Sequence, residues 1–356
     1  MGVYLFVYAI LGFMPILLKK TNTLERKTKK YGAVLGCILL VLLLALRHQS
    51  MGVDLDYKSE IGYLASFDKI NKFTWAEVFT LQWRNYERGY ILYNKLIGFI
   101  WNERQFFLAV SALVAILPIA IVIYKKSVNT FFSYIVYMGL PVFLMSFSGI
   151  RQSIAIGICF LSVLFIQDKK WIKFIVAVLV ASLFHYSAFI FLVAYPLYYL
   201  KFNKNGRVFS LLLIPIIYLL RYPLFTILSK LFKDEAIAND TGAVTLLLVF
   251  CLIYAFCFLF SGKDKETNGY LNLFYLACVC QVFGNVYQLA MRVGYYFMIF
   301  AILLIPKVIQ EMNDDEETKS VVELVVFLAF IAYGLYALRN SSWAQTYPYN
   351  WFWTQI

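Results

Sequence analysis

The sequence predicts an all-α fold: a polytopic integral membrane protein with about 12 transmembrane helices, within a range of about 10–14. Of the 356 residues, 62% are apolar and only 15% are charged, whereas about a quarter of the residues in a soluble domain are charged. Mean hydropathy is +0.72. The 32 lysines and arginines, against 20 acidic residues, gather in short loops between apolar runs, which is typical of cytoplasmic loops. These observations exclude a soluble enzyme, a disordered chain and a disulfide-rich scaffold.

The apolar runs are distributed along the whole chain, and each is expected to form a helix that crosses a bilayer. A spanning helix needs about 17–25 mainly apolar residues, so the shorter runs must extend into their flanks. The first run precedes Lys19, the first charged residue, and we expect it to be retained rather than cleaved as a signal peptide. The expected cores are residues 3–18, 32–47, 105–124, 131–147, 152–166, 171–184, 186–200, 208–220, 243–261, 270–290, 293–306 and 320–338.

The distribution of basic residues predicts the orientation of these helices. Residues 19–30 contain six basic residues and one acidic residue, which favours a cytoplasmic position for this loop. Alternation from that loop gives inner loops with 18 basic residues in 53 positions, whereas the three long outer segments hold 9 in 81. We therefore expect the N- and C-termini to lie outside the cytoplasm.

The whole chain, residues 1–356, is expected to form a single helical membrane domain, because no Pro/Gly/Ser-rich linker and no internal repeat divides it. Its largest polar part is an outer loop, residues 48–104. Within this loop, residues 90–101 are apolar but too short to span a membrane. If they did cross, Lys125 and Lys126 would face outside, so we expect an interfacial or re-entrant helix here.

Ionisable residues at the outer ends of the expected helices are the main sign of function. Charged groups at membrane depth are rare and usually face a cavity or a pathway. These residues come from segments far apart in the sequence, yet the predicted orientation places all of them on one face. They are Arg47, Asp54, Glu87, Arg151, His185 and Arg292.

Each arginine has two interpretations. Arg151, followed by Gln152, lies between two apolar runs: it either extends to the interface or offers its planar guanidinium to phosphate oxygens. Arg292 follows a polar stretch that is either hydrogen-bonding contact between helices or the wall of a wet cavity. Arg47 lies at the end of its apolar run. Extension of its side chain to the membrane interface explains this position as well as a functional role does.

Asp54 and Glu87 are candidates for a general base that takes a proton from an attacking hydroxyl. Asp54-Leu55-Asp56 also has the form of a metal-binding Asp-x-Asp motif, and a solvated turn is the simpler alternative. His185 is either a hydrogen-bonded structural residue or a group that contacts a sugar hydroxyl or assists proton transfer. With two histidines in the chain and all six cysteines inside apolar runs, we expect no metal, no other cofactor and no disulfide.

Together these residues form an ordered series of short motifs. The series resembles the EpsG-like branch of the Wzy-type bacterial polysaccharide polymerases over about residues 45–300. Val53 departs from this resemblance, which favours a small polar residue at that position. The motifs are Arg47 with Gly52-x-Asp54-x-x-Tyr57, Glu87-x-Gly89-Tyr90, Gly149-Ile150-Arg151-Gln152, Phe184-His185-Tyr186-Ser187-Ala188 and Arg292-x-x-x-Tyr296-Phe297.

The resemblance implies a multi-pass glycosyltransferase of GT-C-like architecture in the bacterial inner (plasma) membrane. Such enzymes join oligosaccharide repeat units carried on undecaprenyl diphosphate into O-antigen (in lipopolysaccharide biosynthesis), capsular or exopolysaccharide at the periplasmic face. Expected partners are a flippase and a chain-length-regulating co-polymerase, and not nucleic acid. Asp54, Glu87 and His185 are the expected catalytic residues. The expected substrate-binding residues are Arg47, Tyr57, Arg151, Gln152, Tyr186, Arg292 and Tyr296.

Three alternatives stay open from the sequence. An O-antigen ligase uses the same donor with a different acceptor, and the sequence hardly separates the two. A transporter or flippase of lipid-linked or anionic sugars normally places its polar site near the bilayer midplane, often between inverted repeats. An O-acyltransferase would need a histidine, but its donor gives no reason for several outer arginines.

Overall fold

The computed structural model describes residues 1–20, 25–55, 61–232 and 243–355. In these ranges every regular element is a helix, apart from one isolated antiparallel bridge between Arg47 and Trp351. The prediction of an all-α fold is confirmed. The chain divides into two compact units. Unit 1 comprises residues 1–192 and 324–356, and unit 2 comprises residues 193–323.

Four helical segments among the described residues are long and apolar enough to cross a membrane, and up to seven if each bent helix pair counts as one. Four shorter apolar helical segments of 10–17 residues accompany them. The chain is therefore a multi-pass helical membrane protein. The four long segments are Arg26–Ala45, Arg104–Lys126, Ile150–Gln167 and Glu316–Asn340.

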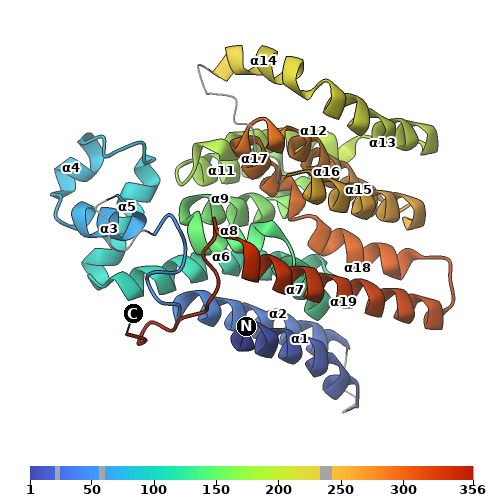
Figure 1. Cartoon of the computed structure of the whole chain (residues 1–356), viewed down its shortest axis with the longest axis horizontal. Helices are drawn as coiled ribbons and strands as arrows, with labels where there is room; N and C mark the ends of the chain where they lie inside the picture. The colour runs from blue at the N-terminus through green and yellow to red at the C-terminus, as the bar shows by residue number, and fades with distance from the viewer. Residues whose placement is uncertain (21–24, 56–60, 233–242, 356) are drawn as a thin grey trace. The chain divides into compact units, whose positions relative to one another are not determined.

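Unit 1 contains the helices within the predicted outer loop (residues 48–104), together with the helices that precede and follow this loop in the sequence. Figure 1 shows α3, α4 and α5 as a group beside one end of α6, and α5 packs on α6. The helices are α1 (Gly2–Lys20), α2 (Glu25–Ala45), α3 (Tyr63–Asn71), α4 (Trp75–Thr80), α5 (Arg88–Ile100), α6 (Arg104–Lys126), α7 (Thr130–Met138), α8 (Pro141–Ser148), α9 (Ile150–Leu161), α10 (Val163–Gln167), α11 (Trp171–Ser182), the 3₁₀ helix η1 (Tyr186–Val193), and most of α19 (Glu316–Asn340).

Residues 131–147, where one span is expected, form two helices, α7 and α8, that meet at a bend of 67° and together are long and apolar enough to cross a membrane. Leu140 between them has an extended backbone, with φ −104° and ψ 146°. Pro141, the first residue of α8, disfavours helical geometry in the residue before it. A second break at Gly149 separates α8 from α9. The break places Arg151 on the first turn of α9.

Hydrogen bonds hold the chain after α2 against the C-terminal segment and against the end of α8. The backbone N–H of His48 donates to Asn350 O over 2.8 Å, and that of Phe352 donates to Leu46 O over 2.9 Å. Further along, the N–H of Asp54 donates to Ser148 Oγ over 3.2 Å. These bonds attach both the outer loop and the C-terminal segment to the same end of unit 1.

Gly52 makes this close approach possible. Its φ is +110°, and a Cβ at this position would lie 1.9 Å from the carbonyl oxygen of Phe147. We expect Gly52→Ala to destabilise the protein by at least about 2 kcal/mol, because a strained backbone and a clash with another backbone atom add together. The thermal unfolding midpoint of the purified protein would test this. Gly2→Ala, where no atom lies within 4 Å of the added Cβ, is the control, and equal midpoints for the two variants would contradict the expectation.

Unit 2 is built around α16. The carboxylate of Asp264 accepts from the backbone N–H groups of Glu266 and Thr267 and so caps this helix. Lys307 lies 3.1 Å from Asp264 and 3.6 Å from Glu311, which ties α18 to the start of α16. The unit's helices are α12 (Ala194–Tyr199), α13 (Lys204–Leu219), α14 (Arg221–Phe232), α15 (Ala243–Phe260), α16 (Lys265–Val282), η2 (Phe283–Asn285), α17 (Gln288–Met298) and α18 (Ala301–Glu311).

Candidate active site

Five of the six ionisable residues expected on one face lie at one end of unit 1. Arg47 and Asp54 follow α2, Glu87 is the residue directly before α5, Arg151 lies in the first turn of α9, and His185 follows α11. The sixth, Arg292, lies in unit 2 on α17, as does Tyr296, which is 1% exposed. Tyr57 lies outside the described residues.

Arg151 occupies an aromatic box. Its guanidinium carbon is 4.5 Å from the ring centre of Tyr86 and 5.8 Å from the ring centres of both Tyr63 and Tyr90. Nε donates to the hydroxyl of Tyr63 over 3.4 Å, and Nη1 donates to the carbonyl of Asn85 over 3.4 Å. Cations are attracted to the faces of such rings. The guanidinium is therefore held in one orientation while the side chain keeps 17% of its surface exposed.

Glu87 binds Arg151 and orders the neighbouring segment. Its Oε2 accepts from Arg151 Nη1 over 2.5 Å, and its Oε1 accepts from the backbone N–H of Tyr186 over 2.8 Å. The start of α5 reaches this segment through Gly89, where a Cβ would lie 2.8 Å from the carbonyl oxygen of Leu183. Both oxygens of Glu87 are thus engaged, so this carboxylate positions Arg151 rather than remaining free to take a proton.

Asp54 differs from Glu87 in this respect. Its backbone binds Ser148 and Tyr63, but no described residue donates a hydrogen bond to its carboxylate. The carboxylate nevertheless lies close to the Arg151 box. Burial raises the pKa of Tyr63 to about 12, with Arg151 opposing and Asp54 adding to the shift. Asp54 is thus the unengaged, half-buried carboxylate beside the box.

His185 is oriented by the residue two positions further along the chain. The backbone N–H of Ser187 donates to His185 Nδ1 over 3.3 Å, and Ser187 Oγ lies 2.7 Å from the same nitrogen. A backbone N–H can only donate, so Nδ1 must be the unprotonated nitrogen. Neutral His185 therefore carries its proton on Nε2.

The other histidine has the same arrangement. The backbone N–H of Ser50 donates to His48 Nδ1 over 3.1 Å. We expect both imidazoles to give the ¹⁵N shifts of the Nε2–H tautomer in the histidine-labelled protein. Ser187→Ala and Ser50→Ala should keep this tautomer, because alanine retains the backbone N–H that donates to Nδ1. Spectra dominated by the Nδ1–H tautomer in the wild type would contradict this interpretation.

The remaining expected site residues differ widely in exposure. Tyr186 is 73% exposed, whereas Gln152 and Arg47 are each 2% exposed. Arg47 Nη1 donates to Ser146 O over 3.0 Å, and its guanidinium lies 5.1 Å from the Phe147 ring centre. Burial lowers the pKa of Arg47 to about 10, with Tyr349 and Tyr4 opposing, so it is cationic at neutral pH. In this conformation Arg47 faces the protein interior.

Tyr63, Asn85, Tyr86 and Ser187 are not among the site residues expected from the sequence, although Ser187 lies within one of the motifs. One signal was available: Tyr86 and Tyr90 flank Glu87 at the start of a helix, and the rings are 5.4 Å apart. Tyr63 gave no signal, because only the packing of α3 on α5 brings it to Arg151.

Comparison with known proteins places the chain in a family. The sequence model of the EpsG family matches residues 30–351, a range that includes every motif described above. Neither a curated protein nor a solved structure matches the chain significantly. A family match over most of the chain shows membership, so this chain belongs to the EpsG family.

Proposed function

We propose that this chain is a polysaccharide polymerase that joins oligosaccharide repeat units carried on undecaprenyl diphosphate. The observation that supports this most is the cluster of Arg151, Glu87, Asp54 and His185 at one end of unit 1. It combines a preorganised cation with a carboxylate to which no described residue donates a hydrogen bond. A cation can stabilise a departing lipid diphosphate, and a carboxylate can take the proton of an attacking hydroxyl.

Arg151 is proposed to bind the diphosphate of the donor. As the anomeric C–O bond breaks, negative charge develops on the departing undecaprenyl diphosphate. A cation already held in place stabilises that charge without reorganising at the moment of reaction. Glu87 and the tyrosine rings hold the guanidinium, and its Nη2, which binds no described residue, can meet a phosphate oxygen.

Asp54 is proposed to act as the general base. The hydroxyl of the acceptor sugar attacks the anomeric carbon, its proton passes to the Asp54 carboxylate, and the diphosphate leaves with the bonding electron pair. A direct displacement of this kind inverts the anomeric configuration. His185 is proposed to help orient the acceptor rather than to accept the proton.

Arg292 and Tyr296 of unit 2 and Tyr57 remain proposed substrate-binding residues, with Tyr186 and Gln152. A GT-C-like architecture with about 12 spans, a site on the periplasmic side of the bacterial inner membrane and external termini also stay predictions, as do the flippase and the co-polymerase. No metal is required in this mechanism, because an arginine neutralises the leaving group.

An O-antigen ligase is the second candidate, because its donor has the same diphosphate. The two functions are separated by supplying the purified protein with lipid-linked repeat units alone. A polymerase converts them into a ladder of longer glycans, whereas a ligase leaves them unchanged until lipid A-core is added. A ladder that forms only with lipid A-core would overturn the proposal.

A further inference from the structure

We propose that unit 1 contains a structural halide site, in which a chloride ion binds the guanidinium of Arg47 in a small polar cavity between α2, α6, α8 and α9. This site is distinct from the box around Arg151. The proposal does not depend on the function proposed above, because its ligand stabilises the fold and is not a substrate.

The first argument is an uncompensated buried charge. Arg47 is 2% exposed, and no described carboxylate forms an ion pair with it. Its Nη1 binds a carbonyl, but its Nε is buried without a hydrogen-bond partner. A buried cation is costly unless an anion or several hydrogen bonds compensate it. The described residues supply only part of the hydrogen bonding and none of the negative charge that would compensate the Arg47 guanidinium.

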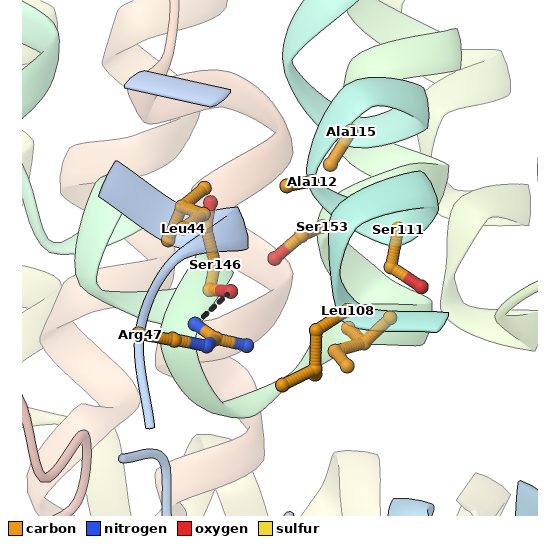
Figure 2. Close-up of a pocket in the computed structure, with 9 residues that line it drawn as sticks. Leu44, Arg47, Leu108, Ser111, Ala112, Ala115, Ser146 and Ser153 are labelled. Carbon is orange, nitrogen blue, oxygen red and sulfur yellow. Dashed lines mark hydrogen bonds between the residues drawn. The ribbon is translucent and has the colours of Figure 1, made fainter. Parts of the chain in front are cut away.

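The second argument is the cavity itself. Its volume is about 10 Å³, which is room for a single small ligand, and its polar lining consists of Arg47, Ser111, Ser146 and Ser153. Figure 2 shows the Ser153 hydroxyl pointing from α9 toward Arg47 and Ser146. This hydroxyl is buried without a hydrogen-bond partner, and Ser153 is 5% exposed. Arg47 Nε and Ser153 Oγ, two groups without a hydrogen-bond partner among the described residues, therefore belong to residues that line the same small space.

The chemistry of the lining selects a small monovalent anion. A guanidinium and a serine hydroxyl both donate hydrogen bonds, and no acidic residue lines the cavity to repel an anion. The other two hydroxyls are engaged, since Ser111 Oγ binds Tyr93 over 3.0 Å and Ser146 Oγ lies 3.4 Å from the Tyr137 hydroxyl. A space of this size does not admit a lipid diphosphate. A halide would satisfy both orphaned groups and neutralise the charge.

Occupancy would stabilise the end of unit 1 that carries the candidate active site. Arg47 contacts three other parts of the unit: its Nη1 donates to Ser146 O of α8, its backbone carbonyl accepts from Gln105 Nε2 of α6 over 3.0 Å, and its backbone pairs with Trp351 of the C-terminal segment. Gly149 and Arg151 follow α8 directly. Loss of the ion would therefore loosen the break that positions Arg151.

The test is the thermal unfolding midpoint of the purified full-length protein in sodium gluconate, titrated with sodium chloride or sodium bromide at constant ionic strength. We expect a saturable rise of roughly 3 °C or more with either halide. Ser153→Ala should raise the half-saturating concentration roughly 10-fold, because one donor is lost. Ser162→Ala, which removes a buried hydroxyl bonded to Cys159 O on the same span, should leave the halide dependence unchanged.

A crystal structure of the protein grown in bromide tests directly whether a halide occupies the site. The proposal expects an anomalous peak within hydrogen-bond distance of Arg47 Nε and Ser153 Oγ. It is overturned if the midpoint is the same in gluconate and chloride, if Ser153→Ala keeps the wild-type halide dependence, or if water without anomalous signal fills the cavity.

Discussion

Replacement of Arg151 by alanine is expected to slow polysaccharide elongation at least about 100-fold. The change removes the cation that would face the departing diphosphate. It also leaves the carboxylate of Glu87, which now pairs with Arg151 over 2.5 Å, without its partner beside an anionic substrate. Arg151→Lys should recover only a small part of the rate, because an ammonium cannot reproduce the planar fork that the box orients. The length distribution of glycans made in cells that lack the wild-type gene would measure the effect.

Arg104→Ala is the matched control for Arg151→Ala. Arg104 also forms an ion pair in unit 1, with Asp68 over 2.5 Å, but its side chain is 32% exposed and lies outside the box. Exposed pairs contribute only about 0–1 kcal/mol, so this variant should elongate glycans normally. If Arg151→Ala, present at the wild-type level in the membrane, still elongates glycans at the normal rate, the proposed role of Arg151 is wrong.

Asp54→Asn is expected to lower kcat by about 10²–10⁴-fold with little change in the KM for the donor. An amide keeps the size of the side chain but cannot accept the hydroxyl proton. Glu87→Gln should behave differently, because both oxygens of Glu87 already hold other groups. We expect it to raise the KM for the donor and to lower kcat less than Asp54→Asn does. Steady-state kinetics on purified lipid-linked repeat units would separate the two.

Asp68→Asn serves as the control for Asp54→Asn, since Asp68 lies in the same unit and pairs with Arg104. Its kcat should remain close to that of the wild type. If Glu87→Gln loses more kcat than Asp54→Asn, and Asp54→Asn stays near the wild type, then Glu87 is the general base and Asp54 is not.

Much of the fold followed from hydropathy, because apolar runs longer than about 17 residues have few alternatives to a spanning helix. The run over residues 105–124 became α6 (Arg104–Lys126). Hydropathy could not reveal the break between α7 and α8, since the residues on both sides of Pro141 are equally apolar. The bend depends on the local backbone preference before proline, which a composition window averages out.

The candidate site was predictable only in part. Charge counting placed Arg47, Asp54, Glu87, Arg151 and His185 at one end, and the structure brings these five to the same end of unit 1. Their individual roles depend on geometry at the scale of one hydrogen bond. The burial of Arg47 and the engagement of both Glu87 oxygens follow from how α5, α8 and α9 pack, and no short motif encodes that packing.

Reconstitution of the purified protein with undecaprenyl-diphosphate-linked repeat units as the only substrate is the most direct test of the central claim. The proposed mechanism predicts a glycan ladder, with one undecaprenyl diphosphate released for each glycosidic bond formed, and neither product from Asp54→Asn or Arg151→Ala. Intact repeat units with no released lipid diphosphate, from wild-type protein whose thermal unfolding shows that it is folded, would contradict it.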